Sequence, residues 1–99
     1  VVIGGYNSSN TQALVRICAE RLPAYHISGA DQIDGAVLHH RPAGGGAVTA
    51  ARDWLPDGPV TVGLTAGAST PNNVVGEVIQ RILALRPQHR RPGCWLIVY

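Results

Sequence analysis

The chain has 99 residues, a length typical of a single domain, and hydrophobic residues make up 45% of it. No apolar run approaches the roughly 18 residues of a membrane-spanning helix and no signal peptide is visible, which argues against a membrane partner. The two cysteines are too few for a disulfide framework and indicate a reducing compartment. Because residue 1 is valine and already lies in a predicted strand, we expect the chain to be cut from a longer protein.

The formal net charge of +2 rests on arginine alone, since the chain has no lysine. Half of the arginines lie in the last fifth of the chain, at Arg81, Arg86, Arg90 and Arg91. A basic patch can bind nucleic acid, but this one is short and few aromatic residues accompany it. We therefore expect a solvent-exposed tail and no nucleic-acid partner.

The first third of the chain is predicted to alternate between strand and helix, in the order strand 1–5, helix 10–22, strand 24–27 and a brief helix 30–33. Apolar residues at helical spacing define one face of the first helix: Leu14, Ile17, Cys18 and Leu22. Pro23 ends this helix, and Ser28 is placed to cap the brief one.

Residues 35–58 show little periodicity and contain His39, His40 and a glycine-rich stretch at 44–46. A helical turn over residues 47–54 is the only regular element expected there. The stretch from Leu55 to Pro59 is rich in turn-forming residues.

The last part of the chain again alternates, with a strand over 60–64, a helix over 72–86 and a final strand over 95–99. Thr70 is a suitable N-cap for the helix, with Pro71 at its first position. Alternating strands and helices predict parallel strands joined by right-handed crossovers. The strands are continuous apolar runs, as expected when helices cover both faces of a sheet. The sequence thus predicts a three-layer α/β domain with a small, mostly parallel sheet flanked by helices.

The same construction occurs twice: an apolar strand runs into small and polar residues, and a helix follows. The first loop (residues 6–11) has the sequence YNSSNT, and the second loop (residues 65–71) has the sequence TAGASTP. Both should emerge at the carboxyl edge of the sheet, where ligands of open α/β sheets bind. Helix N-termini offer unpaired N–H groups and a positive dipole end to an anion. The two loops therefore predict a phosphate-type site whose side-chain donors are Ser8, Ser9, Asn10 and Ser69.

Helix capping alone is the competing interpretation of these polar residues, because serine and asparagine are common N-caps. Neither loop matches the nucleoside-triphosphate P-loop or the dinucleotide-binding fingerprint. Neither contains lysine or arginine, so we expect further charged or polar groups to come from outside these 99 residues.

The stretches GGYNSSNT and VGLTAGASTPNNVVGEVI resemble the LytB (IspH) family of 4-hydroxy-3-methylbut-2-enyl diphosphate reductases. The stretch WLP at 54–56, followed by GPVT, is similar to the longer plant and cyanobacterial type. The resemblance covers roughly residues 1–86. It implies that the chain is a single α/β domain, the third and C-terminal one of the enzyme, with a variable insert at 35–58 and an atypical tail at 87–99.

The resemblance implies an oxidoreductase of isoprenoid biosynthesis, acting last in the methylerythritol phosphate pathway. With a 4Fe-4S iron–sulfur cluster, the family reductively removes the hydroxyl of its allylic diphosphate substrate and forms isopentenyl and dimethylallyl diphosphate. It implies a redox donor such as ferredoxin or flavodoxin, contacts with the remaining domains of the same chain, and a cytoplasmic or plastid location.

Carried over residue by residue, the resemblance assigns substrate diphosphate binding to the same four residues as the helix ends do: Ser8, Ser9, Asn10 and Ser69. It places no catalytic residue and no metal ligand in this chain, because the family's cluster cysteines lie upstream. The chain alone is therefore expected to be inactive and to bind no cofactor. The alternative is a stand-alone phosphate-binding or anion-binding α/β module without redox activity.

Other reactive side chains are not assigned to the site. Cys18 is expected to be a core thiol, and Cys94 lies in a stretch that does not align with the family. His39 and His40 lie in the insert, and Glu77 is distant from the start of its helix. Their roles, and that of the arginine-rich tail, stay open.

Overall fold

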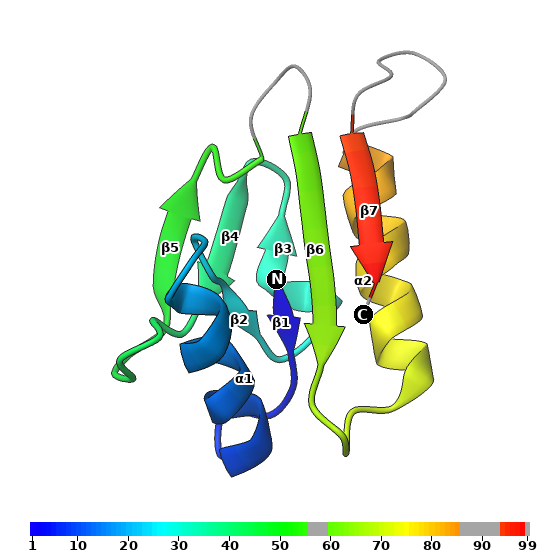
Figure 1. The fold of residues 1–99 in the computed structure, drawn as a ribbon. Helices are drawn as coiled ribbons and strands as arrows, with labels where there is room; N and C mark the ends of the chain where they lie inside the picture. The colour runs from blue at the N-terminus through cyan, green and yellow to red at the C-terminus, as the bar shows by residue number, and fades with distance from the viewer. Residues whose placement is uncertain (56–59, 86–93, 99) are drawn as a thin grey trace.

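Four parallel strands form the centre of the structure, a computed structural model that describes residues 1–55, 60–85 and 94–98 (Figure 1). The helices and strands follow in the order β1 (Val2–Ile3), α1 (Ser9–Ala19), β2 (His26–Ile27), the 3-10 helix η1 (Ala30–Gln32), β3 (Ile33–Asp34), β4 (Val37–His40), β5 (Thr49–Arg52), β6 (Val60–Ala66), α2 (Asn72–Leu85) and β7 (Cys94–Val98).

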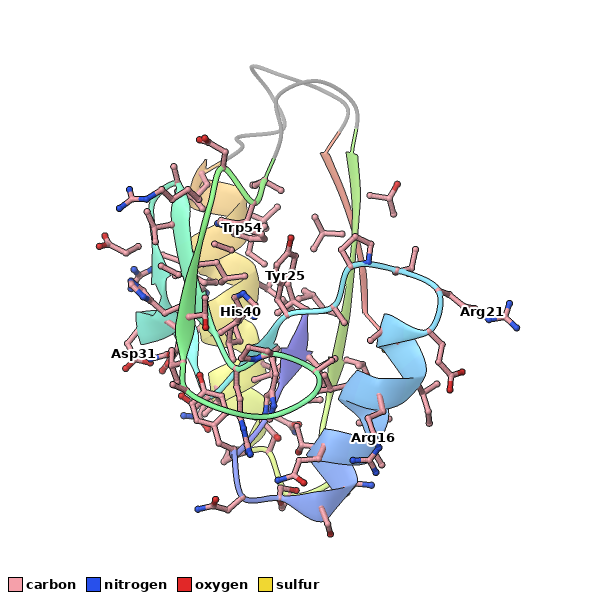
Figure 2. All side chains as sticks on the ribbon, turned by 90° about the vertical axis from the view of Figure 1, so that its left-hand side faces the viewer. Arg16, Arg21, Tyr25, Asp31, His40 and Trp54 are labelled. Carbon is pink, nitrogen blue, oxygen red and sulfur yellow. The ribbon has the colours of Figure 1, made fainter. Side chains whose placement is uncertain are left out.

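The parallel sheet has the strand order β2-β1-β6-β7. From β1 the chain crosses through α1 to β2 on one side, and from β6 it crosses through α2 to β7 on the other side. Right-handed crossovers in opposite directions place the two helices on opposite faces of a sheet, and Figure 2 shows α1 and α2 on either side of it. The predicted three-layer α/β fold is confirmed, and the connection reverses between β1 and β6.

A second, antiparallel sheet of order β3-β4-β5 occupies the region predicted to contain a helical turn at 47–54. That prediction is wrong, because residues Thr49–Arg52 pair along β4 from Arg52 opposite Val37 to Thr49 opposite His40. Gly45 and Gly46 have φ angles of 88° and 102°, which only glycine adopts without strain, and they let the chain turn between these strands. A β-bridge between His26 and Arg41 joins the two sheets.

The core lies between the parallel sheet, α2 and the antiparallel sheet. Ile3, Ile27 and Leu64 from the parallel strands are fully buried, as are Val78 and Ile82 on α2. These side chains form one cluster with buried residues of η1, β3, β4 and the segment after β5: Ala30, Ile33, Leu38 and Trp54. The apolar stripe predicted for the second helix is thus confirmed where it faces the sheet.

The buried face of α1 differs from the predicted one. Thr11 and Val15 are the buried residues of this helix, whereas Ile17 and Leu22 are 63% and 67% exposed. The helix also ends at Ala19, so Leu22 lies beyond it, in a turn whose amides bond to the Cys18 carbonyl. The spacing of apolar residues favoured one face of α1, but the face that lies toward the sheet is the one that carries Thr11. Cys18 is half-buried and is only partly a core thiol.

Along β6 the burial alternates. Val62 and Leu64 point into the core, whereas Thr61 and Gly63 are exposed on the opposite face. The expectation that helices cover both sheet faces is therefore wrong for this strand. An apolar hollow of 400 Å³ lies beside β6 and the start of β1, and Cys18 and Leu22 contribute to its lining.

Of the remaining predictions, one cap is wrong, one strand is confirmed, and most of the tail arginines lie outside the described residues. Ser28 is exposed, and η1 begins after Gly29 with no side-chain cap, so the predicted cap is wrong. The final strand is confirmed as β7, which pairs in parallel with β6. The tail arginines Arg86, Arg90 and Arg91 lie outside the described residues. Within the described part of the chain, neither helix has the length and apolar character needed to cross a membrane.

Candidate functional site

The ends of β1 and β6 bring the two polar loops together. The last residues of these strands, Ile3 and Ala66, pair in parallel register, so both loops leave the sheet side by side. The Gly67 N–H donates to the Ile3 carbonyl at 2.9 Å and continues the pairing by one residue. This place is the point where the sheet connection reverses, which is the usual ligand site of open α/β sheets.

The four predicted binding residues lie at this edge in different environments. Ser8 is the N-cap of α1, and its Oγ accepts a hydrogen bond from the Thr11 N–H at 3.3 Å. Asn10 reaches across, and its Oδ1 accepts from the Ala68 N–H at 2.9 Å. Ser9 and Ser69 are exposed, and no described residue provides a hydrogen-bond partner for either hydroxyl. The structure thus brings both loops together through Asn10 and leaves two serine hydroxyls open to solvent.

Both helix N-termini point toward this edge, since α1 follows β1 and α2 follows β6. Neither helix has an acidic residue in its first turn. The positive ends of two helix dipoles are therefore uncompensated by carboxylates of their own first turns. This arrangement favours an anion at the junction of the loops.

A threonine between two glycines closes the gap between the strand ends. Thr11 is fully buried, and a Cβ at Gly67 would overlap its Oγ1, while a Cβ at Gly4 would lie 2.8 Å from its Cγ2. We call Gly4, Thr11 and Gly67 the strand-end junction. Its Thr11 Oγ1 has no hydrogen-bond partner among the described atoms. The sequence signal was available, since a glycine follows each strand, but the buried partner of both glycines was not predicted.

Thr70 also links the second loop to β1. Its Oγ1 donates to the Ile3 carbonyl at 3.1 Å rather than capping α2, so its predicted capping role is wrong. The helix begins at Asn72, and the amides of Val74 and Val75 bond to the Pro71 carbonyl. A hollow of 270 Å³ lies beside the second loop, lined by Gly67, Ala68, Thr70, Asn72 and residues of β6.

The first loop is held from the antiparallel sheet as well as from α1. The Tyr6 carbonyl accepts a hydrogen bond from Gln12 Nε2 at 2.8 Å and a second, short one from Arg41 Nη1. The Tyr6 hydroxyl donates to Gln32 Oε1 at 2.8 Å. Sequence reasoning missed Arg41, which lies 35 residues from Tyr6. A positive charge from within these 99 residues therefore reaches the first loop, through a backbone carbonyl.

His26 supports the same loop from β2. It is 2% exposed, its Nε2 lies 3.0 Å from the Gly4 carbonyl, and its ring packs edge to face with Tyr6 at a centroid distance of 4.8 Å. Because a carbonyl only accepts, Nε2 carries the proton of this bond. Burial lowers the pKa of His26 below its ordinary value of 6.5; the bond to Gly4 opposes this shift, and the charge of Arg41 adds to it.

The free energy of unfolding is expected to decrease as the pH falls below about 6.5. The pKa of His26 is lower in the folded state than in the unfolded one, so the unfolded chain binds the proton more readily in this window. The contribution of His26 to stability is present at pH values above its pKa in the unfolded state. It is lost as the pH falls through its pKa in the folded state. Urea unfolding at about pH 7.5 and about pH 5 measures the difference, and His26→Gln should remove most of it. A midpoint independent of pH would contradict this assignment.

The other reactive side chains form no additional site in the described residues. Figure 2 shows His40, Tyr25 and Trp54 together. The centroid of the Tyr25 ring lies 5.0 Å from that of His40 and 6.4 Å from that of Trp54, and both contacts are edge to face. The described ring contact of His40 is thus a packing contact, and its buried Nδ1 has no hydrogen-bond partner among the described atoms. Within residues 1–55, 60–85 and 94–98, no group of three His, Cys, Asp or Glu side chains is placed to hold a metal ion.

Comparison with known proteins is consistent with this geometry. The model of the family described as "LytB protein" matches residues 1–83. The chain is 54% identical over 88 residues to the 4-hydroxy-3-methylbut-2-enyl diphosphate reductase of Gloeobacter violaceus, and 53% identical to that of Thermosynechococcus vestitus. Each match covers 87% of this chain but only 21% and 22% of the relatives, so the chain spans about a fifth of their length. No solved structure matches significantly. The chain belongs to the LytB family.

Proposed function

We propose that this chain is the diphosphate-binding part of a 4-hydroxy-3-methylbut-2-enyl diphosphate reductase. The observation that carries the proposal is the Asn10–Ala68 hydrogen bond, which joins the two loops at the sheet edge where the connection reverses. Two helix N-termini without first-turn carboxylates meet there. A diphosphate carries several negative charges, and such a site compensates them through N–H groups, hydroxyls and dipoles.

Each predicted binding residue has a definite part in this proposal. Ser9 and Ser69 donate their exposed hydroxyls to phosphate oxygens, one from each loop. Asn10 donates from its Nδ2 while its Oδ1 holds the second loop. Ser8 caps α1 through its Oγ acceptor, and the hydroxyl proton stays available to the ligand.

The reductive chemistry is assigned to the rest of the enzyme. Cys18 does not fit an iron–sulfur cluster, because it is half-buried beside an apolar hollow and, among the residues whose side chains are described, it is not grouped with other ligands. We propose that a 4Fe-4S cluster and the residues acting on the hydroxyl belong to other domains. Electrons would come from a donor such as ferredoxin or flavodoxin, in the cytoplasm or a plastid. No step of the reduction is derived from this chain.

Ser69→Ala in the reductase that carries this chain is expected to weaken substrate binding by about 1.5–3 kcal/mol, or roughly 10- to 150-fold. The physical reason is the loss of one hydrogen bond to a charged phosphate oxygen. Ser69 is exposed and its hydroxyl has no described hydrogen-bond partner, so the free energy of unfolding should change by less than about 0.5 kcal/mol. The KM for the allylic diphosphate and the inhibition constant of pyrophosphate measure the effect.

Thr61→Ala is the control, because Thr61 is also an exposed hydroxyl residue and lies near the amino end of β6, at the opposite end of this strand from the second loop. It should leave both constants unchanged. Unchanged constants in Ser69→Ala would remove the second loop from the binding site. Pyrophosphate binding by a full-length protein that reduces no allylic diphosphate would instead favour the stand-alone anion-binding module.

A further inference from the structure

The antiparallel sheet reaches the first loop through a single residue, Arg41. This residue follows β4 directly, and its N–H donates to the His26 carbonyl at 2.9 Å, which fixes its backbone to the edge of the parallel sheet. From there its guanidinium extends to the Tyr6 carbonyl. Tyr6 lies two residues before Ser8 in the chain. The hairpin that carries Arg41 thus contacts the loop just ahead of the binding residues.

We propose that Arg41 is a positioning residue for the diphosphate, which holds the first loop in its binding shape and places a positive charge behind it. This inference rests on the proposed function of the two loops. It assigns a binding role to the hairpin β4–β5, in a region where the sequence alone gave no functional signal. Arg41 acts through the loop backbone, and no contact of Arg41 with substrate is needed.

The contacts around Tyr6 support a positioning role. Its carbonyl accepts from two side chains that come from different parts of the fold, Gln12 on α1 and Arg41 after β4. Its ring packs against His26, and its hydroxyl bonds to Gln32. A loop residue held by four separate groups loses its freedom before the ligand arrives, so less ordering entropy opposes binding.

The charge of Arg41 adds an electrostatic contribution. The described residues contain no carboxylate in ion-pair contact with it, and it is only partly exposed, so solvent screens it incompletely. Both polar loops lack lysine and arginine. Arg41 is therefore a source of positive charge at the first loop, and this charge is favourable to an anionic ligand held by that loop.

The experiment compares Arg41→Gln and Arg41→Lys in the full-length reductase. For Arg41→Gln we expect the KM for the allylic diphosphate and the inhibition constant of inorganic pyrophosphate to rise about tenfold, with kcat within about twofold. Arg41→Lys keeps the charge and one donor and should recover most of the affinity. A merely structural role would reduce the fraction of folded enzyme and so the maximal rate, without raising the KM.

Arg52→Gln is the matched control, because Arg52 is an exposed arginine at the other end of the same hairpin. It should leave both constants unchanged. If Arg41→Gln does not fold, Gln12→Ala tests the same carbonyl from the helix side, and we expect about a threefold rise in both constants. Constants within about twofold of the parent for Arg41→Gln, or for Gln12→Ala where it replaces that variant, would overturn the inference. If Ser69→Ala raises them in the same assay, the proposed function survives that failure; if neither variant does, both fail.

Discussion

Asn10→Asp is expected to weaken diphosphate binding roughly a hundredfold or more while the fold stays intact. The Oδ1 of Asn10 accepts from the Ala68 N–H at 2.9 Å, and a carboxylate oxygen in its place keeps this bond. A negative charge in the first turn of α1 is also favourable to the helix dipole, by about 0.3–1 kcal/mol. The donor Nδ2, however, becomes a charged oxygen. A hydrogen bond to phosphate worth about 1.5–3 kcal/mol is lost, and repulsion between like charges is added.

Asn10→Asp is diagnostic because its expected effects on diphosphate binding and on helix stability have opposite signs. Titration calorimetry of the full-length protein with pyrophosphate measures binding, and urea unfolding measures stability. Asn73→Asp is the matched control, because Asn73 is exposed in the first turn of α2 and receives the same charge. Its effect on binding should be at least tenfold smaller, about 1.4 kcal/mol, since it replaces no proposed donor. Equal losses in both variants would mean that only the local charge, and not the Asn10 amide, matters.

The parallel part of the fold could be predicted from the sequence, because its strands are apolar runs and its helices have period 3.6 or clear turn signals. The antiparallel sheet could not. Its strand β5, Thr49–Arg52, consists mostly of small and polar residues with no strand periodicity. These residues form a strand because β4 pairs with them along their whole length. Pairing with the preceding strand β4 decides this element, and its local sequence does not.

The position of the candidate site could be predicted from the sequence, whereas the residues that hold the first loop from other elements could not. Ser8 and Asn10 belong to a local pattern, a polar stretch between a strand and a helix, and the structure places both at the expected sheet edge. Arg41 and His26 act on the first loop from other elements, so no local pattern reveals them. The face of α1 was mispredicted because a polar residue, Thr11, is buried on it, whereas the apolar residue Ile17 of the predicted face is exposed.

Gly67→Ala is expected to destabilise the protein by about 1–3 kcal/mol, the usual cost of overpacking a filled interior. The new methyl group would overlap Thr11 Oγ1 and would lie 3.3 Å from Thr11 Cβ. Thr11 is fully buried and cannot rotate away easily, because its Cγ2 already faces Gly4 on the other side. The strand ends would have to separate, which also disturbs the Asn10–Ala68 bond. A lower urea midpoint in the full-length protein is the expected result.

The double variant Gly67→Ala with Thr11→Ala separates this overlap from a general effect of changing the loop. Removing the Thr11 hydroxyl and methyl frees the space that the new Cβ needs, so the two changes together should cost at least about 1 kcal/mol less than their sum. Gly5→Ala is the control, because a Cβ at Gly5 meets nothing within 4 Å. It should be neutral or stabilising by up to about 1 kcal/mol, since alanine restricts the unfolded chain. Strict additivity of the double variant would show that Thr11 does not set the spacing of the two strand ends, and that the glycines serve the loops in some other way.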